Sequence, residues 1–151
     1  MRTKPSSTFV YVTYIRTTPT KLWAALTQPE FIKQYWFNMQ IESTWKVGAP
    51  WTMQRADGTL TDSGEIVEAK RPRRLVIKWR NEWSPKMKAE GFTRCTMELE
   101  RQGRVVKLSI THEAERANAK IIHAVSGGWP KILSNLKSLL ETGEVAIPSH
   151  H

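Results

Sequence analysis

The feature that most constrains the fold is an amphipathic run near the C-terminal end, at residues 126–143. Its apolar positions recur at helical spacing and are Trp129, Ile132, Leu133, Leu136, Leu139 and Leu140. At 3.6 residues per turn these positions form one stripe, and the positions between them are mostly lysine, serine and asparagine. The run therefore predicts the longest helix of the chain, and a helix with one apolar face must bury that face against another element.

Both ends of this helix carry recognisable signals. Gly143 is expected to end it in a left-handed conformation. Upstream, the apolar phase continues through Ile121, so the helix is expected to begin near Asn118, a suitable N-cap. Because Pro130 has no amide hydrogen and its ring clashes with the preceding turn, we expect a kink or a restart of the helix there.

Most of the remaining sequence has the alternation of strands. Residues 8–17 are rich in β-branched and aromatic side chains and predict a first strand. Two short helices are expected next, at 18–26 and 27–36, each with a proline near its first turn. Further strands are expected at 39–45, 49–55, 61–70, 75–80, 92–101 and 105–112. The polar residues 81–91 are expected to form a loop.

This order of elements predicts an α+β fold made of a single domain over residues 1–151. A curved antiparallel sheet of about six or seven strands would surround the long C-terminal helix, with the two short helices closing one end. A sheet that curves around a helix without filling the space leaves a cavity between them. We expect function to reside in that cavity.

Composition narrows the class of protein. Cys95 is the single cysteine of the 151 residues, so no disulfide framework is expected and a reducing compartment fits best. The first residues lack an apolar signal segment, and no apolar run approaches the roughly 20 residues that span a bilayer. We therefore expect a cytoplasmic protein without a membrane partner.

The chain is basic, with a formal net charge of +9. Four basic residues crowd the turn Lys70–Arg74, and such a cluster is able to bind phosphate groups of a nucleic acid. No exposed aromatics are interleaved with it and no nucleic-acid-binding motif is present. A solvated hairpin turn is thus favoured over a nucleic-acid site, and an acidic protein partner is the intermediate alternative.

Several motifs together resemble START-like (SRPBCC, helix-grip) domains, and in particular the AHSA-type branch named after activators of the heat-shock chaperone ATPase. The segments that carry the resemblance are 18–31, 45–51, 63–68, 72–79, 108–113 and 128–143. The resemblance implies the helix-grip fold, a hydrophobic pocket and, as alternatives for partners, a homodimer or a chaperone. Because this superfamily includes polyketide cyclases, lipid carriers and chaperone co-factors, it implies no single activity.

The side chains that carry chemistry are few. The four histidines are His112, His123, His150 and His151, and none forms a zinc-like spacing with Cys95, so no metal site or other cofactor is expected. Cys95 lies on the apolar parity of its strand and is expected to pack. His112 has inward parity as well, and serves either as a ligand anchor or acid–base group, or as a core histidine bonded to the backbone.

We predict that the cavity binds a small hydrophobic or aromatic molecule. The expected ligand-binding residues are Trp36, Trp79 and Trp129 for stacking, Met97, Ile132, Leu133 and Leu136 for the walls, and His112 for polar anchoring. No catalytic residue is assigned. The alternatives are a co-chaperone-like interaction module that uses its basic surface, an enzyme of the cyclase type that uses His112, and tryptophans that simply fill a core.

Overall fold

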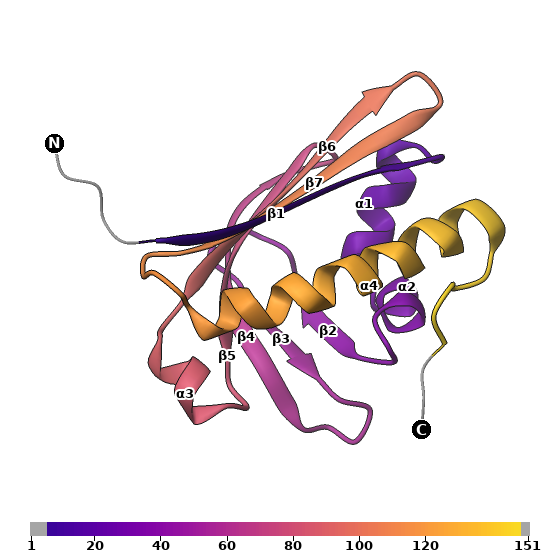
Figure 1. Cartoon of the computed structure of the whole chain (residues 1–151). Coiled ribbons are helices and arrows are strands. Elements are labelled where there is room, and N and C mark those ends of the chain that lie inside the picture. Colours follow the sequence, from indigo (N-terminus) through magenta and orange to yellow (C-terminus); the bar gives the residue numbers. More distant parts are fainter. Residues whose placement is uncertain (1–5, 149–151) are drawn as a thin grey trace, which may run out of the picture.

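The computed structural model describes residues 6–148. Its elements follow one another as strand, two helices, four strands, a short helix, two strands and a long helix (Figure 1). In chain order they are β1 (Ser7–Ile15), α1 (Pro19–Thr27), α2 (Pro29–Tyr35), β2 (Gln40–Ser43), β3 (Pro50–Gln54), β4 (Leu60–Lys70), β5 (Arg74–Asn81), α3 (Pro85–Ala89), β6 (Thr93–Gln102), β7 (Val105–Ala114) and α4 (Lys120–Thr142).

The strands form one antiparallel sheet in the order β1-β7-β6-β5-β4-β3-β2. The sheet curves around α4, with α1 and α2 toward the C-terminal half of that helix and α3 near its N-terminal end (Figure 1). This arrangement confirms the predicted α+β helix-grip fold. It also places the beginning of β1 beside the end of β7, so the first and last strands of the chain are neighbours.

Alternation along the strands decides which side chains face the helix. In β7 every second residue from Val106 to Ala114 is buried, and His112 belongs to this inward series. On β1 the opposite face carries Val10, Val12 and Tyr14, which are exposed. The apolar side chains of the concave face, of α1, α2 and of α4 merge into a main core cluster.

Helix α4 runs without a break from Lys120 to Thr142 and contains Pro130, so the expected restart does not occur. Trp129, Ile132 and Leu133 are all buried, and the apolar face therefore continues across the proline. Burial of these side chains offsets the one backbone hydrogen bond that proline removes.

The two ends of α4 differ in how well the sequence predicted them. Gly143 has φ 87° and its amide donates to the Leu139 carbonyl at 2.9 Å, which confirms the left-handed end. At the other end the N-cap is Ala119, and Asn118 precedes it with φ 54°. The expected Asn118 cap is wrong because the capping carboxylate comes from elsewhere in the chain, from Glu90.

The segment 81–91, expected as a loop, contains the five-residue helix α3. Ser84 caps this helix by accepting a hydrogen bond from the Met87 amide at 3.3 Å, and Pro85 follows at the first helical position. None of the residues of α3 is fully buried, so apolar periodicity could not reveal it. The Ser-Pro pair was the available signal.

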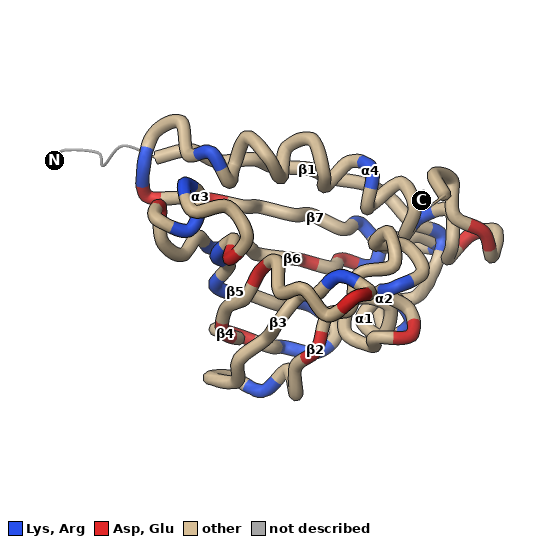
Figure 2. The backbone as a smooth tube through the Cα atoms, turned by 90° about the horizontal axis from the view of Figure 1, so that it is seen from below, with Lys and Arg blue, Asp and Glu red and all other residues tan. Residues whose placement is uncertain are grey.

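Charged residues are distributed over the whole molecule. Lys and Arg positions occur along strands, loops and helices, and Asp and Glu positions lie among them (Figure 2). The net charge of +9 is consequently not concentrated in one element.

Candidate functional site

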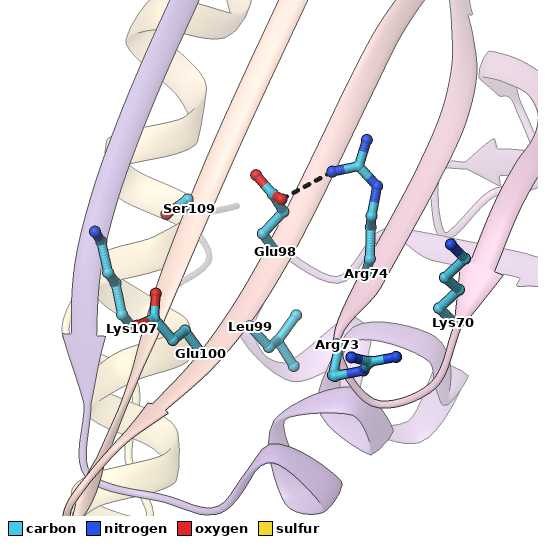
Figure 3. A pocket seen from close by; sticks show the side chains of 8 residues that line it. All are labelled: Lys70, Arg73, Arg74, Glu98, Leu99, Glu100, Lys107 and Ser109. Atoms are coloured by element: carbon cyan, nitrogen blue, oxygen red, sulfur yellow. Dashed lines mark hydrogen bonds and ion pairs between the residues drawn. The ribbon is translucent and has the colours of Figure 1, made fainter.

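The predicted basic turn borders an open groove of about 450 Å³ on the outer face of the sheet (Figure 3). Its lining residues are Lys70, Arg73, Arg74, Glu98, Leu99, Glu100, Lys107 and Ser109. Arg74 is already engaged, since its guanidinium lies 2.8 Å from Glu98 and 2.9 Å from Glu68. Basic charge in this groove is thus partly neutralised from within the chain, which favours the solvated turn over a phosphate-binding surface.

The inner face of the sheet holds a cluster of four tryptophans. Trp36 follows α2, Trp51 and Trp79 come from β3 and β5, and Trp129 comes from α4. The ring centroids are 5.2 Å apart for Trp36 and Trp129, 5.7 Å for Trp79 and Trp129, and 5.0 Å for Trp51 and Trp79. These rings pack on one another and fill much of the space between sheet and helix.

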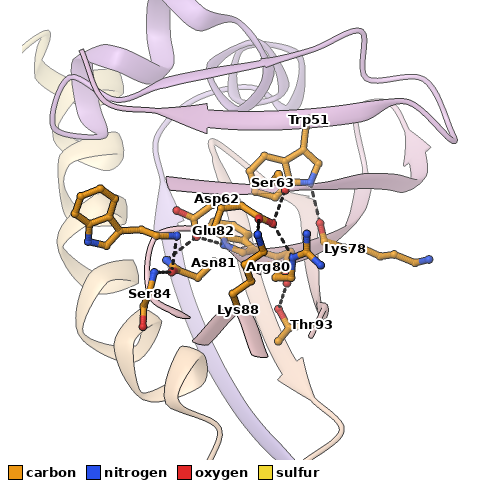
Figure 4. A network of polar contacts seen from close by, with 12 residues as sticks. Trp51, Asp62, Ser63, Lys78, Arg80, Asn81, Glu82, Ser84, Lys88 and Thr93 are labelled. Atoms are coloured by element: carbon orange, nitrogen blue, oxygen red, sulfur yellow. Dashed lines mark hydrogen bonds and ion pairs between the residues drawn. The ribbon is translucent and has the colours of Figure 1, made fainter. Parts of the chain in front are cut away.

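A glycine makes this cluster possible. The Trp51 indole lies across Gly64 of the neighbouring strand and donates to the Lys78 carbonyl at 2.8 Å (Figure 4). A Cβ on Gly64 would stand 1.7 Å from that carbonyl oxygen and 2.6 Å from Trp51 Nε1. Only a residue without a side chain therefore allows the ring to reach its acceptor.

Beside the cluster lies a cavity of about 160 Å³ that is open to solvent on one side, which we call the tryptophan cavity. The residues that line it are Trp36, Asp62, Trp79, Asn81, Met87, Ile121, Ala124, Val125, Gly128, Trp129 and Ile132. They come from the residue that follows α2, from β4, β5 and α3, and from the part of α4 between Ile121 and Ile132. Apolar cavities of about 150 Å³ bind benzene, whereas drug-sized ligands occupy about 300–1,000 Å³. The cavity is thus sized for one ring.

Asp62 is the charged group of the cavity wall. Its side chain is 8% exposed, and its Oδ2 accepts hydrogen bonds from Trp79 Nε1 at 2.8 Å and from Asn81 Nδ2 at 3.4 Å. Burial raises the pKa of Asp62 above its ordinary value, and these hydrogen bonds oppose the rise. Within residues 6–148, no lysine, arginine or histidine forms an ion pair with Asp62.

Sequence reasoning missed Asp62, although one signal was present. Asp62 shares its strand parity with Gly64 and Ile66, and Ile66 is an inward, fully buried residue. An acidic residue at an inward position of a strand in a curved sheet indicates either a buried ion pair or a binding group.

His112 lies behind the cavity in a chain of hydrogen bonds. Trp129 Nε1 donates to His112 Nδ1 at 3.3 Å, so the proton of the neutral ring is placed on Nε2. Nε2 then donates to Thr93 Oγ1 at 2.8 Å, and that hydroxyl donates to the Trp79 carbonyl at 2.8 Å. Burial lowers the pKa of His112 to about 4, which keeps the imidazole neutral. The histidine thereby fixes the position of Trp129.

The eight predicted ligand-binding residues fall into two groups. Trp36, Trp79, Trp129 and Ile132 line the tryptophan cavity. Met97, His112, Leu133 and Leu136 are buried in the surrounding core and are not among the lining residues. The structure therefore brings the three predicted tryptophans together around one cavity. The predicted polar anchor, His112, lies in the core and does not line that cavity.

The rim of the cavity on the α3 side is held by two glutamates. Glu82 Oε2 accepts from Arg80 Nε at 2.7 Å and from Ser63 Oγ at 2.8 Å, and Oε1 lies 3.2 Å from Lys88 Nζ (Figure 4). These contacts, led by the bond from Arg80, lower the pKa of Glu82 to about 2. Glu90 reaches the backbone amides at the start of α4. The segment that carries Met87 is thus tied to both β5 and α4.

Other chemistry finds little support in the described part of the chain. No group of three or more His, Cys, Asp or Glu side chains there is arranged to hold a metal ion, and His150 and His151 lie outside the described residues. Cys95 is fully buried, and burial raises its thiol pKa. Between residues 6 and 148 no helix is both long and apolar enough to cross a membrane.

A curved antiparallel sheet that grips a long C-terminal helix, with a cavity between the two, defines a START-like (helix-grip) domain. Residues 16–141 match the model of the family described as activator of Hsp90 ATPase homolog 1-like protein. The chain belongs to this family. None of the curated proteins compared with the chain matches it.

Solved structures share the fold at low sequence identity. Protein MLL2253 from Mesorhizobium loti is 22% identical with a TM-score of 0.78, and the match covers 92% of this chain and 100% of that one. The Aha1 dimer from Colwellia psychrerythraea is 19% identical with a TM-score of 0.74, covering 91% and 98%. CalU16 from Micromonospora echinospora is 19% identical with a TM-score of 0.73, covering 91% and 78%. At such identities the likeness establishes the fold.

Proposed function

We propose that the chain binds a small, largely apolar molecule of about one ring in the tryptophan cavity. The observation that carries this proposal is the cavity of about 160 Å³ walled by Trp36, Trp79 and Trp129. Rigid aromatic walls offer a large contact area to a planar guest. Asp62 and Asn81 add the few polar groups that orient a ligand in such a site.

The packed tryptophans limit the size of the guest. Because Trp51 and Trp79 contact each other and Trp36 contacts Trp129, the space beyond the cavity is occupied by side chains. A long acyl chain or a fused polycyclic molecule would have to displace one of these rings. We therefore expect the site to select its ligands by size. The space available is smaller than the hollow that the sequence predicted.

A size series tests the proposal by calorimetry and tryptophan fluorescence. Benzyl alcohol is expected to bind saturably, and dodecanol and a naphthalene alcohol are expected to bind at least about tenfold more weakly. Gly128 lines the cavity while Gly127 is exposed, and a Cβ at either position would meet no atom within 4 Å. Gly128→Leu should therefore fill the cavity and abolish binding, whereas Gly127→Leu should retain it. Equal binding by the two variants, or none by the unmodified chain, would refute the proposal.

The geometry favours a binding protein over an enzyme of the cyclase type. His112, the candidate acid–base group, is 0% exposed and both of its ring nitrogens have partners within the core. A general acid or base must come within hydrogen-bond reach of the reacting group. His112 does not line the cavity and therefore acts as support for Trp129.

A second candidate function is association with another copy of this chain through β1. This strand lies at an edge of the sheet, and its outer face exposes Val10 by 57%, Val12 by 41% and Tyr14 by 46%. An apolar edge strand is a template for pairing with a second strand. The Colwellia relative is described as a dimer.

Light scattering coupled to size-exclusion chromatography tests this association. Val12→Lys should shift a dimer to monomer without loss of the fold, and Lys107→Ala on the neighbouring strand is the control. A monomer at all concentrations would reject the β1 interface. A chaperone partner remains the alternative: capture of a chaperone from lysate at low salt, and its loss at moderate salt, would favour a charge-led contact instead.

A further inference from the structure

We infer that the guest of the tryptophan cavity is a small organic cation, an amine or ammonium group on a body of about one ring, with Asp62 as its counter-ion. This inference rests on the proposed function, because it names the class of ligand for the same cavity.

The charge on the cavity wall is not balanced by a positive group in the described part of the chain. Asp62 is 8% exposed, and its hydrogen-bond donors, which include the Trp79 indole, the Asn81 amide and Thr61, are neutral. A buried carboxylate without a counter-charge is costly, so such groups are normally paired. Across residues 6–148 the ion pairs of the chain leave Asp62 out. A cationic guest would complete the pair.

The carboxylate shares the cavity with three indole rings. Trp36, Trp79 and Trp129 line the same cavity as Asp62. The face of an indole ring attracts a cation more strongly than other aromatic faces do, and aromatic cages are the usual receptors for ammonium groups. The Asp62 carboxylate and the indole rings thus both favour a positively charged guest.

The same cavity disfavours an anionic guest. An anionic guest would meet Asp62 directly, and the nearby Glu82 already acts on Asp62 as a like charge. No lysine, arginine or histidine is among the described residues that line the cavity, and Arg80 and Lys88, each next in sequence to a lining residue, are occupied by Glu82. The cavity wall therefore offers an anion no free positive group.

Three one-ring probes of different charge separate the possibilities: benzylammonium, benzyl alcohol and benzoate. Calorimetry gives their affinities, and the Nε1–H resonance of Trp79 in ¹⁵N-labelled protein reports directly on Asp62, to which it is hydrogen-bonded. We expect benzylammonium to bind at least about tenfold more tightly than benzyl alcohol. We expect benzoate to bind more weakly than either.

Asp62→Asn is the decisive variant, and Glu65→Gln on the exposed face of the same strand is its charge-matched control. Asp62→Asn should abolish the preference for benzylammonium over benzyl alcohol, and Glu65→Gln should retain that preference. If the Asp62→Asn variant does not fold, the ratio of the affinities for benzylammonium and benzyl alcohol in the unmodified chain still tests the cation assignment.

The outcomes distinguish this inference from the proposed function. Equal affinities for the cation and the alcohol, or a preference that survives Asp62→Asn, would overturn the cation assignment and leave the cavity as a neutral site. Failure of all three probes to bind would overturn the proposed function itself. Tighter binding of benzyl alcohol than of benzylammonium would indicate a protonated Asp62 that donates a hydrogen bond. That result would also reject the inference.

Discussion

Asp62 combines a stability cost with a proposed role in binding. Burial raises its pKa, so the folded state disfavours the ionised form, and stability is lost as pH rises through the folded pKa. Asn at this position would keep an oxygen for the Trp79 and Asn81 donors without the charge. We therefore predict that Asp62→Asn raises the melting temperature at pH 7, as scanning calorimetry will show. A lower melting temperature would mean that the carboxylate stabilises the fold.

The buried imidazole of His112 should make the stability of the fold depend on pH. Its folded pKa of about 4 lies below its ordinary value of 6.5, so the unfolded state binds a proton first and stability falls as pH drops between these values. The loss amounts to about 3 kcal/mol at the lower limit. In His112→Gln, urea unfolding should show a stability deficit at pH 7 that narrows by about this amount near pH 4. His123→Gln, on an exposed position, serves as the control. A deficit that does not change with pH would contradict the neutral, buried ring.

The packing of the sheet around Gly64 should not tolerate a side chain at this position. Its Cβ position is 1.7 Å from the Lys78 carbonyl oxygen, so Gly64→Ala must displace a strand or expel the Trp51 indole. We expect a loss of about 3 kcal/mol in the free energy of unfolding. Gly127→Ala is the matched control, because that helical position is open and should gain about 0.5–1 kcal/mol. Denaturant melts measure both, and a neutral Gly64→Ala would refute the role assigned to this glycine.

At the scale of elements, α3 and α4 act as one unit through Glu90. Its carboxylate accepts from the Lys120 amide at 2.9 Å and from the Ile121 amide at 3.2 Å, in the place of an N-cap side chain. Glu90→Ala should cost about 1 kcal/mol and should speed hydrogen exchange at the first turn of α4. Lys86→Ala, on the exposed side of α3, should leave exchange unchanged. Unaltered exchange in the glutamate variant would show that the helix start is held by other contacts.

The strands and long helix could be predicted from local patterns, and the contacts between distant elements could not. The period-two runs gave β3 to β7 within a residue or two, because one face of each strand is buried. Glu90, by contrast, lies 30 residues before Lys120, and no local signal connects the two. No local signal indicated either that Ala119, and not Asn118, is the N-cap of α4.

The candidate site shows the same division. Trp36, Trp79 and Trp129 could be predicted to face the interior from their spacing alone. Their mutual packing, which narrows the hollow to about 160 Å³, depends on Gly64 and Trp51 in other strands. The place of His112 behind Trp129 likewise follows from the sheet register, which pairs it with Cys95 on β6 and Phe9 on β1.

At the scale of the whole molecule, the fold functions as a frame around a small cavity. The sheet supplies Asp62 and Trp79, α4 supplies Trp129 and Gly128, and α3 supplies Met87 at the rim. Because no residue of α3 is fully buried and the helix is held by Met87 and by the contacts of Glu82 and Glu90, we expect it to be the element that moves to admit a guest. Exchange at α3 should therefore slow on saturation with benzylammonium, while exchange in β6 and β7 should not change. Uniform protection across the molecule would argue against a moving rim.

The most direct measurement is a crystal structure of the chain soaked with 4-bromobenzylamine, in which the anomalous signal locates the bromine. We expect one peak in the cavity between Trp129 and Trp79, with the ammonium group of the guest turned toward Asp62. A cavity closed by the tryptophan and Met87 side chains, with the bromine only on the outer surface, would contradict this expectation.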